Sequence, residues 1–153
     1  MAGTLWLLRH GDAEPHRAGS DFERRLTARG EQQSRAAGCA FARLGVRFDR
    51  VFASPRVRAL ETARLACAEL GLEPTVHAPL GGGFDEGDCA QLLAGTRAGA
   101  SVLLVGHEPD LSGLVAAMTG ARVEMKKGGI AAIRDHQLVE LLRPSEIELV
   151  AGL

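Results

Sequence analysis

A short apolar run at Thr4–Leu8 ends abruptly in Arg9-His10-Gly11, and this junction constrains the fold more than any other feature. An apolar run of this length without polar alternation is typical of a strand buried on both faces. The run Ser101–Val105 has the same character and ends at Gly106-His107. Strands of this kind occur in sheets that helices cover on both sides, so the pattern predicts a layered α/β domain.

Helix signals separate the expected strands. Ala28–Leu44 has apolar residues at helical spacing, with Thr27 as a suitable N-cap and Gly45 just beyond the end. A second helix is expected to start at Ser54-Pro55 and to run to about residue 70, because serine is a good N-cap and proline suits the first helical position. Shorter helices are expected near 88–93 and 111–118.

The remaining strand signals complete a single domain. Arg50–Ala53 and Thr75–Ala78 are expected to be strands, and Ile130–Arg134 with Gln137–Leu142 to form a hairpin. Segments 12–26 and 81–86 are expected to be loops. A chain of 153 residues is the size of one domain, so residues 1–153 are predicted to form one three-layer α/β/α sandwich. Its central sheet is mostly parallel, with an antiparallel edge from the hairpin.

Composition excludes several classes of protein. The three cysteines, Cys39, Cys67 and Cys89, are scattered and form no CxxC pair, which favours a reducing cytoplasm over a disulfide scaffold or a thiolate zinc site. The net charge of −1 gives no reason to expect nucleic acid or an anionic membrane as a partner. The apolar runs are too short to span a bilayer.

Reactive side chains follow the buried strands. Ligands bind beyond the carboxyl ends of parallel strands, where His10 and His107 are both expected. The guanidinium of Arg9 disfavours a cationic His10, so this imidazole is expected to be neutral and nucleophilic. Arg56 and Arg58 lie at a predicted helix start, where cations oppose the helix dipole, and this placement indicates a bound anion. Together these groups suit a dianionic phosphoryl group.

Three segments carry a family resemblance. The segments at 5–14 (LWLLRHGDAE), 54–63 (SPRVRALETA) and 105–111 (VGHEPDL) resemble, in order, the motifs of the histidine phosphatase superfamily. The resemblance covers nearly the whole chain and is nearest to the SixA-type phosphohistidine phosphatases. It places the phosphate-binding arginine of the second motif at Arg58, with Arg56 as the weaker candidate.

The resemblance implies a phosphoglycerate mutase-like fold and a metal-independent phosphatase without a cofactor. His10 would attack phosphorus and form a phosphohistidine, while Arg9, Arg58 and His107 hold the phosphoryl oxygens. The segment between Gly71 and Ser101 is too short to hold a helical lid as well as its expected elements. An uncovered site favours phosphohistidine on a protein, such as a histidine phosphotransfer domain, as the substrate, with a small phosphate ester as the alternative.

The general acid is left open between acidic residues of one loop. Larger relatives place a carboxyl group before the third motif, and here Asp85 and Glu86 are the leading candidates, with Asp88 next. The other charged residues near the motifs, including Asp21 in the loop after His10 and the pair Lys126-Lys127, are interpreted as solvated.

Two other functions compete with this interpretation. A metal-dependent hydrolase would take ligands from His10, Asp12, His107 and Asp110, but the guanidinium of Arg9 would repel the cation. A phospho-ligand binding module without turnover would keep the same cationic site, although the pair of histidines argues against it.

Overall fold

The computed structural model describes residues 3–16 and 19–153, in which a six-stranded sheet has the order β3-β2-β4-β1-β5-β6. The strands are β1 (Leu5–Arg9), β2 (Arg50–Ala53), β3 (Thr75–Val76), β4 (Val102–Gly106), β5 (Ile130–Arg134) and β6 (Gln137–Leu142). The helices are α1 (Ala28–Arg43), α2 (Val57–Ala68), α3 (Glu86–Ala94), α4 (Asp110–Thr119) and α5 (Pro144–Ala151), with short 3-10 helices η1 (Asp21–Glu23) and η2 (Ala78–Gly81).

Parallel pairing brings the two histidine-bearing strand ends together. Strand β1 pairs in parallel with β4, from Leu5 opposite Val102 to Arg9 opposite Gly106. Strands β2 and β3 continue the parallel sheet, whereas β5 runs antiparallel to β1 and β6. The mostly parallel sheet with an antiparallel hairpin is therefore confirmed.

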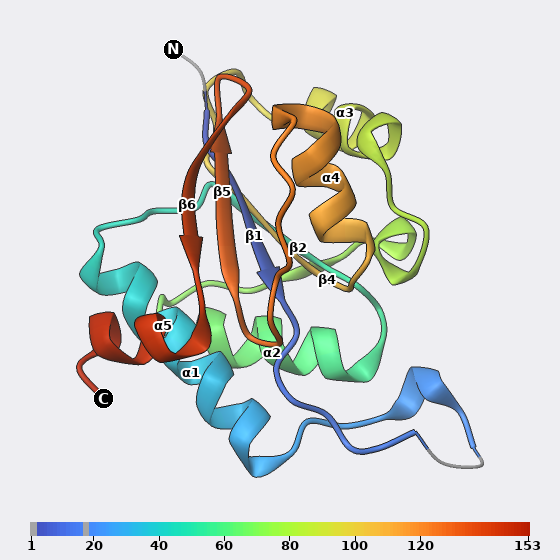
Figure 1. The fold of residues 1–153 in the computed structure, drawn as a ribbon, viewed down its shortest axis with the longest axis vertical. Coiled ribbons are helices and arrows are strands. Elements are labelled where there is room, and N and C mark those ends of the chain that lie inside the picture. The colour runs from blue at the N-terminus through green and yellow to red at the C-terminus, as the bar shows by residue number, and fades with distance from the viewer. Residues whose placement is uncertain (1–2, 17–18) are drawn as a thin grey trace.

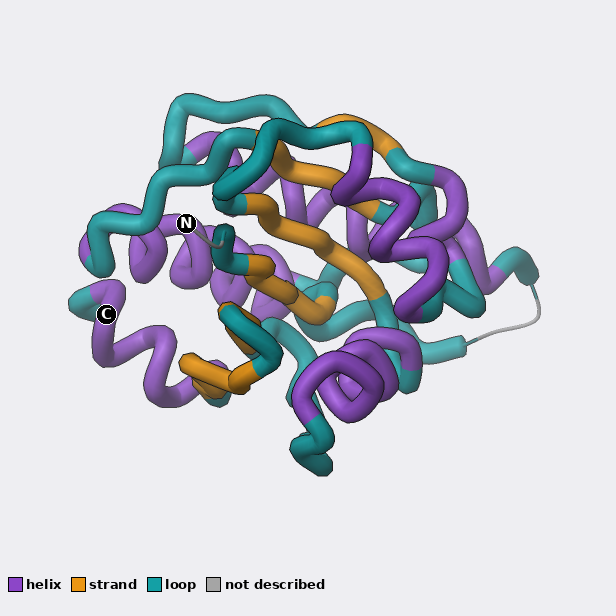
Figure 2. The backbone as a smooth tube through the Cα atoms, turned by 90° about the horizontal axis from the view of Figure 1, so that it is seen from above, coloured by secondary structure: helices purple, strands orange, loops and turns teal. Residues whose placement is uncertain are grey.

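Helices cover both faces of the sheet (Figure 1). Alternate residues of β1 point to opposite faces: Trp6 packs in one core cluster with Phe41 of α1, and Leu7 packs in the other with Leu111 of α4. Figure 2 shows the strands passing between the two groups of helices. On the α1 and α2 side many of the buried residues are alanines, which let these helices pack closely. The predicted three-layer sandwich is confirmed.

The segment between β3 and β4 is short, as the sequence predicts. It consists of η2, a glycine-rich turn and α3, and its described residues include no helical lid. No helix in ranges 3–16 and 19–153 is both long and apolar enough to cross a bilayer.

Several element boundaries differ from the prediction. The second helix begins at Val57, not at Ser54-Pro55, because the Ser54 hydroxyl accepts a hydrogen bond from the Arg56 amide in a turn that precedes the helix. The first strand extends to Arg9, and the third ends at Val76, where the chain turns into η2. Helix α5, which follows the hairpin, is not predicted from the sequence at all.

Candidate active site

The structure brings His10 and His107 together at the carboxyl ends of β1 and β4. Their ring centroids lie 5.3 Å apart, with an angle of 52° between the ring planes. The backbone amide of His10 donates to the carbonyl of Gly106 at 3.1 Å, which continues the pairing beyond the strands. Both rings are buried, with 6% and 7% of each residue exposed.

The environment of His10 fixes which ring nitrogen is free. Its Nδ1 lies 2.7 Å from the carbonyl oxygen of Gly11. A carbonyl oxygen can only accept, so Nδ1 carries the proton and Nε2 keeps its lone pair when the ring is neutral. The pKa of His10 is lowered to about 4, mainly by burial and also by the charges of Arg58 and Arg9, while the hydrogen bond to the Gly11 carbonyl opposes the shift. Neutrality was predicted from Arg9 alone, but burial is the larger cause.

His107 is held by a hydrogen bond with Ser54. Its Nε2 lies 2.7 Å from the hydroxyl oxygen of Ser54, which is completely buried. Burial lowers the pKa of His107 to about 3, with smaller contributions from His10, Arg58 and Arg56. Both imidazoles are therefore neutral at pH 7.

Two guanidiniums stand beside the histidines, that of Arg58 buried and that of Arg9 half-buried. Arg58, in the first turn of α2, donates from Nη1 to the backbone carbonyl of Asp21 at 2.9 Å. Arg9, the last residue of β1, donates from Nη1 to the carbonyl of Met125 at 2.8 Å. Burial lowers the pKa of each below its usual value, but arginine stays cationic at neutral pH.

Three nitrogens around His10 lack a partner. Arg9 Nε, Arg58 Nε and His107 Nδ1 are buried without a hydrogen-bond partner in the described residues. A buried donor without a partner costs about 1–3 kcal/mol, so such groups in native proteins call for an explanation. Each of the three can donate a hydrogen bond, and donors of this kind bind oxyanions through charge-assisted hydrogen bonds.

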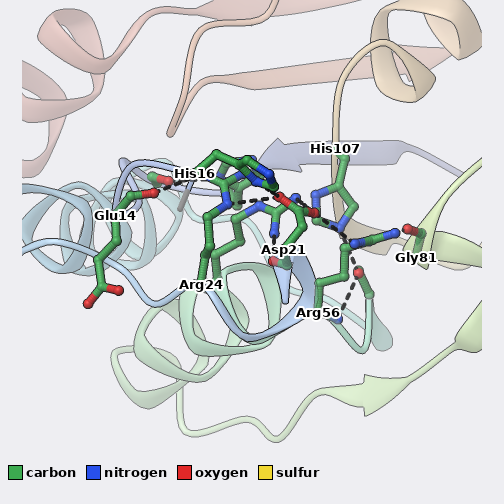
Figure 3. Close-up of polar contacts among 11 residues, drawn as sticks. Glu14, His16, Asp21, Arg24, Arg56, Gly81 and His107 are labelled. Carbon is green, nitrogen blue, oxygen red and sulfur yellow. Dashed lines mark hydrogen bonds and ion pairs between the residues drawn. The ribbon is translucent and has the colours of Figure 1, made fainter. Parts of the chain in front are cut away.

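Asp21 is a site residue that the sequence analysis missed. It was interpreted as a solvated loop residue, but its carboxylate accepts from Arg56 at 2.8 Å, from Arg24 at 2.8 Å and from Arg58 at 3.2 Å (Figure 3). Burial alone would raise the pKa of Asp21, but the hydrogen bond from Arg24 and the charge of Arg58 outweigh it and lower the pKa to about 2. No local sequence signal links Asp21 to Arg56 and Arg58, which lie 35 and 37 residues further along the chain.

Arg56 lies just before helix α2 and contacts two loops beside the site. It is the N-cap residue of α2, not a residue of its first turn as predicted. Its Nε donates to the carbonyl of Gly81 at 2.6 Å, and its Nη1 donates to the carboxylate of Asp21. The guanidinium therefore ties the loop after β1 to the glycine-rich turn that precedes α3.

Two of the three candidate acids form hydrogen bonds at the start of α3. Asp85 is the N-cap of α3 and accepts from the Asp88 amide, while the Asp88 carboxylate accepts from the Asp85 amide. Glu86 is exposed in the first turn of α3. In the described part of the chain, neither Asp85 nor Glu86 forms a hydrogen bond with His10 or His107.

The two aspartates considered as metal ligands, Asp12 and Asp110, interact with other groups of the protein. Asp12 accepts from the Thr27 hydroxyl at 2.8 Å and lies 3.6 Å from the ammonium of Lys127. Asp110 accepts from the amide of Phe84. Within residues 3–16 and 19–153, no three histidine, cysteine, aspartate or glutamate side chains are grouped so that they could hold a metal ion.

Lys127, interpreted as a surface residue, lies close enough to lower the pKa of His10.

An α/β sheet with two neutral histidines and two arginines at its parallel strand ends defines a class of protein that handles phosphoryl groups. The family model of the histidine phosphatase superfamily (branch 1) matches residues 5–82. An uncharacterised protein of Picosynechococcus sp. is 35% identical over 138 residues, which cover 85% of this chain and 84% of that protein. The chain belongs to the histidine phosphatase superfamily.

Other relatives agree with this assignment. The 2,3-bisphosphoglycerate-dependent phosphoglycerate mutase of Caulobacter vibrioides is 41% identical over 66 residues, which cover 41% of this chain and 28% of the mutase. The protein histidine phosphatase SixA in complex with tungstate has a TM-score of 0.79 and 28% identity, over 93% of this chain and 97% of that chain.

A second solved structure, from Agrobacterium tumefaciens and described as a candidate phosphohistidine phosphatase SixA, has a TM-score of 0.81 and 23% identity, over 94% and 99% of the two chains. The phosphoglycerate mutase-like fold and the resemblance to SixA-type proteins are thus confirmed.

Proposed function

We propose that this protein is a phosphatase that removes the phosphoryl group from phosphohistidine on a protein, with His10 as the nucleophile. The observation that carries the proposal is the state of His10, a neutral ring beside two cationic guanidiniums. Its Nδ1 donates to the Gly11 carbonyl, and its Nε2 has no hydrogen-bond partner among the described residues. A free lone pair on a neutral nitrogen is what attack on phosphorus requires.

The reaction would proceed in two displacements. In the first, the lone pair of His10 Nε2 forms a bond to phosphorus, the phosphorus–nitrogen bond to the substrate imidazole breaks, and that nitrogen takes a proton from solvent. In the second, a water oxygen bonds to phosphorus, the bond to His10 breaks, and the water proton returns to solvent as phosphate leaves. The overall reaction is hydrolysis, and it uses no cofactor.

The unpartnered nitrogens would stabilise both steps. Arg9, Arg58 and His107 would each donate to an oxygen of the phosphoryl group, whose charge is spread over its three equatorial oxygens in the transition state. Removing one such donor typically costs about 10²–10³ in kcat. We therefore expect Arg58→Ala to lose turnover on this scale.

A protein substrate is favoured because residues 3–16 and 19–153 form no helical lid over the site. The printed name of a structural neighbour, protein histidine phosphatase, supports the same substrate class. Arg56, Arg24 and Lys127 add positive charge around the site, which suits an anionic phosphoprotein. The free cysteines fit a reducing cytoplasm, which is where we place the reaction.

The leaving group decides whether an acid is needed. Loss of an imidazole from phosphohistidine needs little acid assistance because the phosphorus–nitrogen bond is labile. Asp85 and Glu86 are proposed to assist only when an ester oxygen leaves. Asp85→Asn, which can still cap α3, and Glu86→Gln are expected to slow ester hydrolysis and to spare phosphohistidine hydrolysis.

The test compares two substrates. Purified protein is mixed with a phosphotransfer protein that carries phosphohistidine, and separately with p-nitrophenyl phosphate. We expect the phosphohistidine to be hydrolysed with the higher kcat/KM and His10→Ala to abolish both activities. Hydrolysis of small esters at micromolar KM, with the phosphoprotein ignored, would assign the enzyme to small phosphate esters. Equal rates for the wild type and His10→Ala would support a binding module without turnover.

A further inference from the structure

Ser54 is completely buried directly after β2, at the centre of a hydrogen-bond chain that ends at His107. Its hydroxyl oxygen accepts from the backbone amide of Arg56 at 3.1 Å. The same oxygen lies 2.7 Å from His107 Nε2.

The direction of the bond to His107 follows from counting protons. A serine hydroxyl has one proton to donate and two lone pairs. The Arg56 amide occupies one lone pair. If His107 Nε2 donated into the other, the Ser54 proton would need a different acceptor, and the described residues provide none within hydrogen-bond distance. That arrangement would leave both the Ser54 proton and His107 Nδ1 without a partner, whereas donation from Ser54 to Nε2 leaves only the Nδ1–H for a ligand to accept, so the Ser54 proton points at His107 Nε2.

We propose that Ser54 is a positioning residue that holds neutral His107 as the Nδ1–H tautomer and thereby makes its buried Nδ1 a donor to the phosphoryl group. This inference rests on the proposed function. A neutral imidazole donates from only one nitrogen, and the other tautomer would turn a lone pair toward the phosphoryl oxygens. Burial keeps the ring neutral, so the tautomer decides whether His107 attracts or repels the substrate.

The two histidines then share one tautomer for opposite reasons. The Gly11 carbonyl accepts from His10 Nδ1, which frees Nε2 as a nucleophile. The Ser54 hydroxyl donates to His107 Nε2, which leaves Nδ1–H as a donor. In each ring, the neighbour that binds one nitrogen determines whether the second nitrogen carries a lone pair or a proton.

The direct test is nitrogen-15 NMR of histidine-labelled protein at pH 7, with the His107 signals assigned by their loss in His107→Ala. We expect the wild type to show a protonated Nδ1 and an unprotonated Nε2 on His107, with and without inorganic phosphate. A proton on Nε2, alone or in an imidazolium, would overturn the proposal. This readout needs no turnover, so failure of the phosphatase assay with the tautomer intact would reject the proposed function and leave the tautomer assignment standing.

Variants supply a second readout. In Ser54→Ala, His107 is expected to populate both tautomers, and kcat is expected to fall on the order of 10-fold, part of the loss expected for a missing donor. Ser54→Thr, which keeps the hydroxyl, should restore the wild-type nitrogen signals. The matched control is Ser34→Ala, because Ser34 is equally buried but donates to Gly30 within α1. An unchanged tautomer and unchanged kcat in Ser54→Ala would also contradict the proposal.

Discussion

Acid is expected to destabilise this protein through its buried active-site histidines. Histidine in an unfolded chain has a pKa of about 6.5, whereas burial is the main cause that lowers the pKa of His10 to about 4 in the folded protein. The unfolded state therefore binds its proton first as the pH falls, and the free energy of unfolding decreases from about pH 6.5 until His10 itself is protonated near pH 4. The gap of about 2.5 pH units corresponds to about 3 kcal/mol at about 1.4 kcal/mol per unit.

Urea denaturation of the wild type and of His10→Asn at a series of pH values between 7 and 4 measures this contribution. Carboxyl groups titrate in both proteins and cancel in the difference. The wild type should lose stability relative to the variant by up to about 1.4 kcal/mol per pH unit across this range. His10 also lowers the pKa of His107, so its removal weakens the acid sensitivity of the second ring as well. Parallel stability curves for the two proteins would refute the reasoning.

Three further predictions concern other parts of the site. Asp21→Asn should lower the free energy of unfolding by about 1 kcal/mol at pH 7, because the ion pairs that it breaks are partly exposed and therefore weaker than buried ones. The control Asp135→Asn, in an exposed turn, should leave the free energy of unfolding unchanged. Gly30→Ala should lower the free energy of unfolding by about 1–3 kcal/mol, because a Cβ there would clash with the Asp12 carbonyl oxygen. Gly113→Ala, which has open space around the new Cβ, should not lower it, and thermal unfolding of both variants tests the difference. Phosphatase activity should survive EDTA; loss that added metal restores would contradict this.

The order of elements and the two histidines were predictable because they depend on local signals. Each fully buried strand is a short apolar run, and the residue after it is placed by the parallel sheet, so His10 and His107 can be assigned to one edge without coordinates. Arg9 follows from the same logic, as a strand end. The helix start left Arg56 and Arg58 as alternatives, and the family resemblance selected Arg58.

The contacts that orient these groups were not predictable. Asp21 reaches Arg58 across 37 residues of sequence, and Ser54 reaches His107 across 53. Neither residue has a local pattern that distinguishes it from a solvated loop residue or an ordinary helix cap. Helix α5 was missed because its eight residues give too short a stretch for periodicity to reveal.

Trapping the covalent intermediate tests the proposed chemistry at its first step. The protein is mixed with phosphoramidate, a small compound with a phosphorus–nitrogen bond, quenched under alkaline conditions that preserve phosphohistidine, and analysed by phosphorus NMR and peptide mass spectrometry. We predict a single phosphoryl group on Nε2 of His10, absent from His10→Ala. Turnover without any phosphorylated histidine, or a phosphoryl group on His107 instead, would contradict the assignment of His10 as the nucleophile.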